Sequence, residues 1–288
     1  MIGIFDSGSG GLSVLREILR ILPKEKYVYY SDNANCPYGE KSVEFIRNRA
    51  REITRLLISK GAQIIVVACN TATAAAISVL REEFPVKFIG MEPAVKPAAL
   101  SSKTGVIGVL ATAGTLKASR YLNIKEMFGD GTKIAEHVGE GFVELVENGI
   151  LDGPEAEETV RKSVLPLVAA GADRIVLGCT HYPFLRKVIE RVAGPGVQVI
   201  DPAPAVARHL AEVMKQEGLL DHEYADVPAA AGPAPAGHGA AGQAAGEPEA
   251  AHPAAEIELI ASGPELPARR LLDTIISGHA GRQTATKA

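Results

Sequence analysis

Two cysteines, Cys69 and Cys179, each follow an apolar run that is typical of a buried strand. The first lies in GAQIIVVACNTA at 61–72 and the second in GADRIVLGCTHYP at 171–183, so polar residues follow each thiol at once. A thiolate is a base, and two thiols facing one substrate carbon can remove a proton from one face and return one to the other. The pattern therefore indicates inversion of a stereocentre, with no need for a covalent intermediate, a metal or a pyridoxal cofactor.

The elements that must position these thiols are short apolar runs separated by segments of helical length. The runs lie at 2–5, 27–30, 64–68, 86–89, 105–110, 133–138, 174–178, 197–200 and, near the end, 257–262. Continuously apolar strands that alternate with helices predict parallel sheets covered on both faces. In such sheets the active site lies beyond the carboxyl ends of the strands, where both cysteines fall.

Helix N-termini are expected directly after both cysteines. Their unpaired N–H groups should lower the pKa of each thiol and attract carboxylates. Each thiol also needs a group to handle its proton, and the best-placed titratable residues are Asp6, in the first strand–helix loop, and His181.

The chain shows signs of an internal duplication. IGIFDSGSGGLSVL at 2–15 and VIGVLATAGTLKAS at 106–119 both read as a strand, a loop of small residues and a helix, and each precedes one cysteine motif. We therefore predict an α/β fold of two similar doubly wound domains with parallel-rich sheets, related by a pseudo-twofold axis, with the active site in the cleft between them. Domain I is expected to span 1–95 plus about 205–288, and domain II 96–204. Within domain I, the Ala/Gly/Pro-rich segment 228–255 is predicted to be a flexible insert.

Composition narrows the functional class. The chain has 288 residues and a net charge of −4, with no dense basic cluster, so no nucleic-acid partner is expected. No apolar stretch reaches the roughly 20 residues of a membrane helix, and the amino-terminal strand does not read as a signal peptide. The three cysteines are an odd number, which favours free thiols and a cytoplasmic location.

Five motifs resemble those of the glutamate racemases, cofactor-independent enzymes that make D-glutamate for the bacterial cell wall. They are GIFDSGSGGLSVLREI (3–18), YYSDNANCPYGEKS (29–42), VVACNTATA (66–74), LATAGTLKASRY (110–121) and LGCTHYPFL (177–185). The resemblance covers about residues 1–220 and the last 30. The opening DSGSGG together with GCTH, with His rather than Glu after the second Cys-Thr, favours glutamate over aspartate.

The resemblance implies a role for each matching residue. Cys69 would act on D-glutamate with help from Asp6, and Cys179 on L-glutamate with help from His181, while Glu147 would be a further acid near the second base. The residues implied in substrate binding are Asp6, Ser7, Pro37, Tyr38, Gly39, Cys69, Asn70, Thr71, Thr112, Thr115, Cys179, Thr180 and His181. It implies no metal ligand and no cofactor, and we expect a homodimer.

Other interpretations remain open. Cys36, which lacks a strand–cysteine context, is expected to lie in the core or line the pocket, and Glu147 can instead face solvent. A metal-binding module would use Cys36, Cys69, Cys179 and His181, although their spacing matches no zinc pattern. A regulatory module would bind an amino acid without turnover, and a racemase of another acidic amino acid would show the same motifs.

Overall fold

The computed structural model describes residues 1–129, 131–220 and 255–284. Among them lie two sheets in which every strand pairing is parallel. The first sheet consists of β1 (Ile2–Asp6), β2 (Lys26–Ser31), β3 (Ile64–Val67), β4 (Lys87–Gly90) and β9 (Glu256–Ala261), and the second of β5 (Val106–Ala111), β6 (Lys133–Val138), β7 (Arg174–Gly178) and β8 (Gln198–Ile200). The predicted α/β class with parallel sheets is confirmed.

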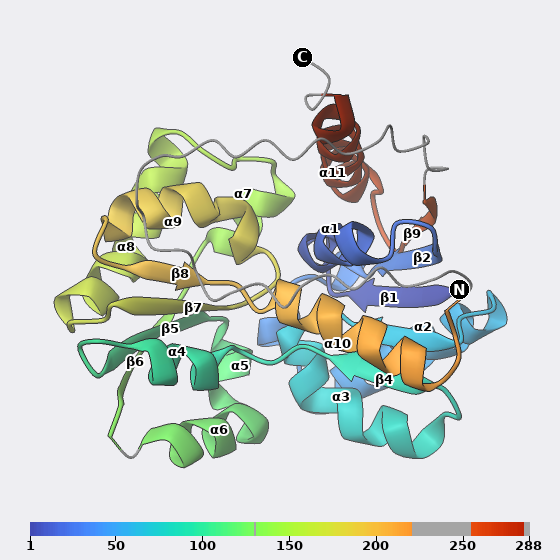
Figure 1. Cartoon of the computed structure of the whole chain (residues 1–288), viewed down its shortest axis with the longest axis horizontal. Helices are drawn as coiled ribbons and strands as arrows, with labels where there is room; N and C mark the ends of the chain where they lie inside the picture. Colours follow the sequence, from blue (N-terminus) through green and yellow to red (C-terminus); the bar gives the residue numbers. More distant parts are fainter. Residues whose placement is uncertain (130, 221–254, 285–288) are drawn as a thin grey trace, which may run out of the picture.

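The two sheets repeat one strand order. The first runs β4-β3-β1-β2-β9 and the second, read from its other edge, β8-β7-β5-β6. β1 therefore corresponds to β5, and β3 to β7, so the two predicted similar α/β units are present. In Figure 1 the two sheets lie side by side, each with helices around it.

Helices cover both faces of each sheet because adjacent strand residues point to opposite sides. Ile4 of β1 packs in the cluster that includes α1 and α10, whereas Phe5 packs with α2 and α3. In the second unit α8 and α9 pack together, and α4 packs with α6. The helices are α1 (Leu12–Ile21), α2 (Val43–Ser59), α3 (Asn70–Glu83), α4 (Val95–Ser101), α5 (Ala113–Lys117), α6 (Ser119–Gly129), α7 (Phe142–Glu147), α8 (Pro154–Ala169), α9 (Arg186–Ala193), α10 (Ala203–Gln216) and α11 (Leu266–Thr284).

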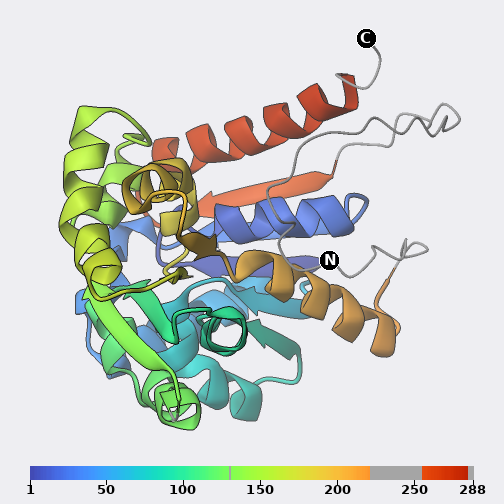
Figure 2. The ribbon, with the colours of Figure 1, turned by 60° about the vertical axis from the view of Figure 1, so that its left-hand side comes forward.

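The end of the chain returns to the first sheet. α10 and α11 both pack on α1, and β9 pairs with β2 at the sheet edge. Figure 2 shows α11 running alongside α1. The expected packing of the last helix on the main body is confirmed, whereas the domain boundaries at 95 and 205 stay predictions. All but the last residue of the predicted flexible insert, 228–255, lies outside the described residues.

Candidate active site

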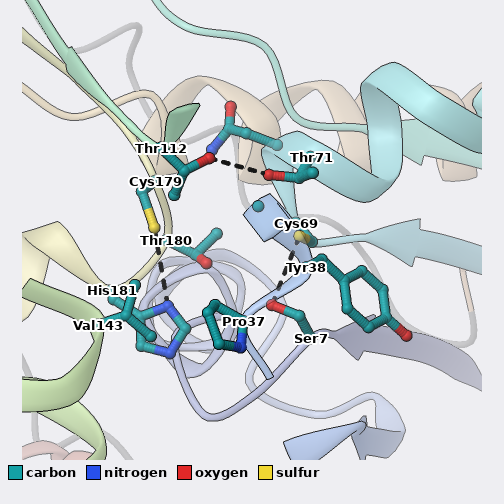
Figure 3. Close-up of a pocket in the computed structure, with 12 residues that line it drawn as sticks. Ser7, Pro37, Tyr38, Cys69, Thr71, Thr112, Val143, Cys179, Thr180 and His181 are labelled. Atoms are coloured by element: carbon teal, nitrogen blue, oxygen red, sulfur yellow. Dashed lines mark hydrogen bonds between the residues drawn. The ribbon is translucent and has the colours of Figure 1, made fainter. Parts of the chain in front are cut away.

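The two cysteines occupy corresponding places in the two units. Cys69 follows β3 and Cys179 follows β7, each beside the central strand of its own sheet. The parallel pairings bring the ends of β1 and β3 to one edge, and the ends of β5 and β7 to another. Both thiols then line one pocket, to which each sheet contributes (Figure 3).

The pocket gathers most of the residues that the sequence predicts for the site. The pocket is narrow, and the space of about 280 Å³ within it includes solvent at its open mouth. The lining residues are Ser7, Pro37, Tyr38, Gly39, Cys69, Asn70 and Thr71 from the first unit, and Thr112, Val143, Cys179, Thr180 and His181 from the second. Three predicted residues do not line the pocket themselves: Asp6, Thr115 and Glu147. Val143 lines it but was not predicted, because an apolar side chain does not indicate a chemical role.

Cys69 is a buried thiol at the N-cap of α3. Its Sγ accepts a hydrogen bond from the Ala72 N–H at 3.4 Å and contacts the Ser7 hydroxyl at 3.7 Å. Burial raises the pKa of this thiol, nearby Asp6 raises it further, and the Ala72 N–H only partly offsets both. The helix N-terminus does lower the pKa of Cys69 through the Ala72 N–H, but the expected net lowering is wrong, because desolvation outweighs the helix end.

The second thiol lies beside a buried imidazole. Cys179 Sγ is 3.8 Å from His181 Nδ1, and His181 Nε2 is 2.7 Å from Glu147 Oε1. Burial alone would lower the pKa of His181, but its bonds to Cys179, Cys36 and Glu147 raise it well above the ordinary value. Burial likewise opposes charge on Glu147, yet His181 and the Ser9 N–H lower the pKa of its carboxyl to about 2. Both shifts favour the charged forms of the pair, an imidazolium and a carboxylate.

Glu147 does not face solvent, which was the alternative left open for it. Its side chain is 19% exposed, and its Oε1 accepts from the Ser9 N–H at 2.8 Å as well as from His181. α7 ends at this residue, which places its carboxylate against the β1–α1 loop.

The local structure after Cys179 differs from the expectation of a helix N-terminus. A short 3₁₀ turn, Tyr182–Leu185, follows His181, and α9 begins only at Arg186. The two thiols therefore have different polar neighbours. The N-terminus of an α-helix lies at Cys69, whereas the His181 imidazole lies at Cys179.

Asp6 is fully buried and organises the β1–α1 loop. One carboxylate oxygen accepts from the Gly11 N–H at 2.8 Å, and Thr180 Oγ1 donates to the other at 3.4 Å. Burial raises the pKa of Asp6, while charge on His181 and the Gly11 N–H act against this rise.

Polar groups available to a ligand lie on the other side of the pocket. Asn70 is 4% exposed, and neither its amide nitrogen nor its oxygen has a hydrogen-bond partner among the described residues. Beside it the hydroxyls of Thr71, Thr112 and Thr115 lie 3.1–3.2 Å from one another. A buried unpaired amide is costly unless a ligand or water satisfies it, and a polar ligand in the pocket could satisfy that of Asn70.

Tyr38 contributes to the pocket wall, but its hydroxyl is already bonded. The phenol donates to Asp32, which also accepts from Arg49 on α2 at 2.7 and 3.0 Å. Asp32 lies within the SDNANCPYG motif, but it is not among the residues predicted for the site. Arg49 could not have been found from sequence spacing, because it lies on the next helix.

The four cysteine and histidine ligands of the metal-module interpretation do not come together. In the part of the chain that the structure describes, the metal-ligating side chains close enough to share an ion are Cys36, Glu147 and His181. Cys36 does not line the pocket, although it reaches His181 from the first unit.

A family model described as Asp/Glu/Hydantoin racemase matches residues 2–210 of this chain. The chain belongs to this family. It is accordingly a racemase, which is a kind of isomerase. None of the helices in the described ranges is long and apolar enough to cross a bilayer.

Relatives of known name agree with this assignment. A glutamate racemase from Methylococcus capsulatus is 50% identical over 224 residues, which is 78% of this chain and 83% of the relative. The crystal structure of a glutamate racemase isoform from Bacillus anthracis matches with a TM-score of 0.77 and 29% identity, over 96% of this chain and 94% of that one. The Escherichia coli glutamate racemase, solved with L-glutamate and an activator, UDP-MurNAc-ala, matches with a TM-score of 0.74 and 30% identity over the same shares.

Proposed function

We propose that this racemase interconverts L- and D-glutamate by a two-base mechanism without a cofactor, and that it supplies D-glutamate for peptidoglycan. The observation that carries the proposal is the pair of thiols: Cys69 and Cys179 end corresponding strands and line one small pocket from two units. The names of the similar proteins support glutamate as the substrate.

In the direction from L- to D-glutamate, the Cys179 thiolate removes the Cα proton and the electron pair stays on Cα. Cys69, whose raised pKa keeps it protonated, then gives its proton to the opposite face. The product is D-glutamate, with a thiol at Cys179 and a thiolate at Cys69. The reverse reaction begins from that state, so each turnover exchanges the roles of the two cysteines.

The surrounding residues handle charge and position. The protonated His181 offers its Nδ1–H to a Cys179 thiolate, while Glu147 balances the imidazolium. Asp6 holds the proton that Cys69 exchanges, which is a role its raised pKa supports. Asn70, the threonine hydroxyls and the N-terminus of α3 bind the substrate carboxylates.

The test is proton NMR of each glutamate enantiomer in D₂O with no cofactor added, with chirality measured on the same sample. The parent protein is expected to exchange the Cα proton for deuterium and to produce the other enantiomer. Cys69→Ala and Cys179→Ala are each expected to lower racemisation by at least about 100-fold, since each removes one acid–base group.

Isotope exchange in the same two variants shows which cysteine acts on which face of the substrate Cα. Each variant is the control for the other. With Cys69→Ala only L-glutamate should exchange its Cα proton, and with Cys179→Ala only D-glutamate. Full racemisation by either variant would refute the two-base mechanism. Turnover of aspartate but not of glutamate would show that aspartate is the substrate. Absence of proton exchange with both amino acids would favour a module that binds an amino acid without turnover.

A further inference from the structure

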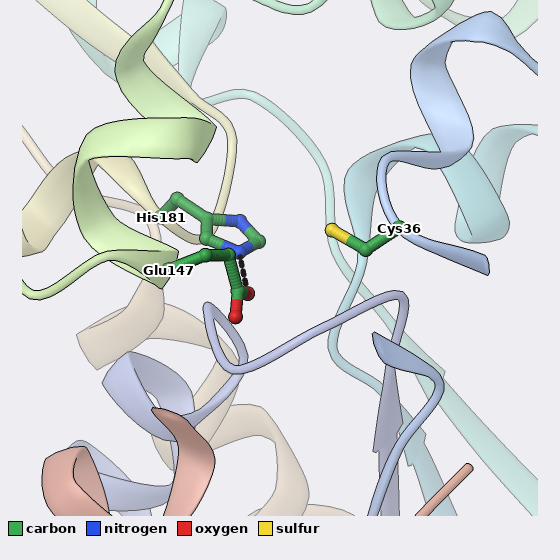
Figure 4. A group of neighbouring side chains, drawn as sticks. All are labelled: Cys36, Glu147 and His181. Atoms are coloured by element: carbon green, nitrogen blue, oxygen red, sulfur yellow. Dashed lines mark hydrogen bonds and ion pairs between the residues drawn. The ribbon is translucent and has the colours of Figure 1, made fainter. Parts of the chain in front are cut away.

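Cys36 stands beside the imidazole–carboxylate pair and is not among the residues that line the pocket. Its Sγ, a ring nitrogen of His181 and a carboxylate oxygen of Glu147 all lie within 4.8 Å of one another. Figure 4 shows the thiol pointing toward the ring across the space between the two units. Cys36 comes from the segment after β2, whereas Glu147 ends α7 and His181 follows β7.

A thiol, an imidazole and a carboxylate are a donor set suited to Zn²⁺. Zinc bonds of roughly 2.0–2.3 Å in a tetrahedron hold neighbouring donor atoms about 3.3–3.8 Å apart. Cys36 Sγ therefore needs to approach the other two atoms by at most about 1.5 Å, while the 2.7 Å contact between His181 Nε2 and Glu147 Oε1 lengthens to admit the ion. Calcium and magnesium prefer sets made of oxygen alone, so a borderline-soft ion is favoured.

Two of the donors are held in place before any ion arrives. His181 is 1% exposed, and Glu147 is fixed by the Ser9 N–H at 2.8 Å. Such outer contacts orient ligands and strengthen metal binding. Cys36 is partly exposed, which gives an ion access to the group.

We propose that Cys36, Glu147 and His181 form an inhibitory site for Zn²⁺ that links the two units. On binding, Cys36 loses its thiol proton and the imidazolium loses one ring proton, and both protons go to solvent. An imidazole whose one nitrogen holds zinc cannot be an imidazolium, so His181 no longer offers the charged ring that favours the Cys179 thiolate in the proposed mechanism. The inhibition rests on the proposed function, whereas the binding does not.

Binding is tested with Co²⁺ as a spectroscopic probe and with Zn²⁺ by calorimetry on the full chain. The parent protein should bind one Co²⁺ with a thiolate-to-cobalt charge-transfer band, and Zn²⁺ should displace it. Cys36→Ser should abolish the band and weaken zinc binding by about 10- to 100-fold or more. Cys36→Ala serves the same purpose if the serine variant folds poorly.

The matched control is Glu144→Gln, which removes an exposed carboxylate one turn earlier on the same helix and should leave metal binding unchanged. Racemisation is then measured against zinc concentration, each variant relative to its own rate without metal. Zinc should inhibit the parent and Glu144→Gln, and should inhibit Cys36→Ser only at concentrations at least about tenfold higher.

If the cobalt spectrum and the zinc inhibition of Cys36→Ser both equal those of the parent, the proposal is overturned. Such a result would indicate that the ion binds Cys69 and Cys179 instead. Absence of metal binding by the parent protein would also overturn it. If the parent lacks racemase activity but shows the thiolate band, the proposed function fails while the metal site stands.

Discussion

At the scale of single residues, burial opposes charge on the titratable groups of the site, and specific partners decide which charges survive. Cys69 has only a weak backbone partner, so burial raises the pKa of its thiol. His181 and Glu147 lie 2.7 Å apart, and this contact favours the charged form of each. The pKa shifts therefore favour a neutral thiol at Cys69 and a charged imidazole beside Cys179.

Glu147→Gln is expected to reduce the free energy of unfolding by about 2 kcal/mol near pH 5.5, since it removes a buried charged hydrogen bond. The carboxyl, with its pKa lowered from 4.5 to about 2, stabilises the fold above pH 4.5, and this contribution is lost as the pH falls toward 2. The imidazole, with its pKa raised above 6.5, stabilises the fold below that pH, and this contribution is lost as the pH rises through the raised value.

The difference between parent and variant should therefore be largest between about pH 4.5 and 6.5 and should shrink on both sides. Thermal and urea unfolding of both proteins across this range measure it. A difference that stays constant with pH would show that the pair is not ionised in the fold.

At the scale of elements, the β1–α1 loop brings the two units into contact. Gly10 lies directly against the ring of His181, and a Cβ on it would come within 2.7 Å of Cγ and Cε1. Ser13 of α1 donates to the Thr180 carbonyl at 2.8 Å. The small residues of this loop therefore allow the backbone of one unit to approach Thr180 and His181 of the other.

Gly10→Ala is expected to displace the His181 ring and to lower kcat by about 10- to 100-fold, because small displacements of catalytic groups are costly. Gly196→Ala is the matched control, since a Cβ there meets nothing within 4 Å. Steady-state kinetics and circular dichroism of both variants distinguish lost positioning from lost folding. Equal kcat in the two variants would mean that the loop accommodates the methyl group.

At the scale of the whole molecule, the substrate pocket is shared by the two units and its thiols are nearly inaccessible. Cys69 is 5% and Cys179 8% exposed. A bound substrate therefore contacts both units at once, and it should stabilise the whole fold. The homodimer stays a prediction, because the structure describes one chain.

Glutamate at about 100 times its Kd should stabilise the protein by about 2.7 kcal/mol, as expected for a ligand that binds only the folded state. The rise in melting temperature should occur with both enantiomers and should be smaller in Asn70→Ala, which lacks the unpartnered amide. Differential scanning fluorimetry measures this. An equal rise with sodium chloride at the same ionic strength would contradict specific binding.

The sequence by itself determined the parallel α/β architecture and the position of the two thiols after buried strands, because local sequence patterns predict both. Continuous apolar runs define buried strands, and a cysteine after such a run lies at the catalytic edge of a parallel sheet. The predicted roles of the site residues rest on longer motifs that resemble one family.

Only the tertiary structure decided the electrostatics and the contacts between distant segments. The pKa of Cys69 is raised because burial, which no local pattern reports, outweighs the helix end. Arg49 bonds to Asp32, and Cys36 reaches His181 and Glu147, across separations in the chain that carry no periodic signal. The first contact arises within one unit and the second only when the two units come together, because desolvation and proximity are properties of the folded molecule.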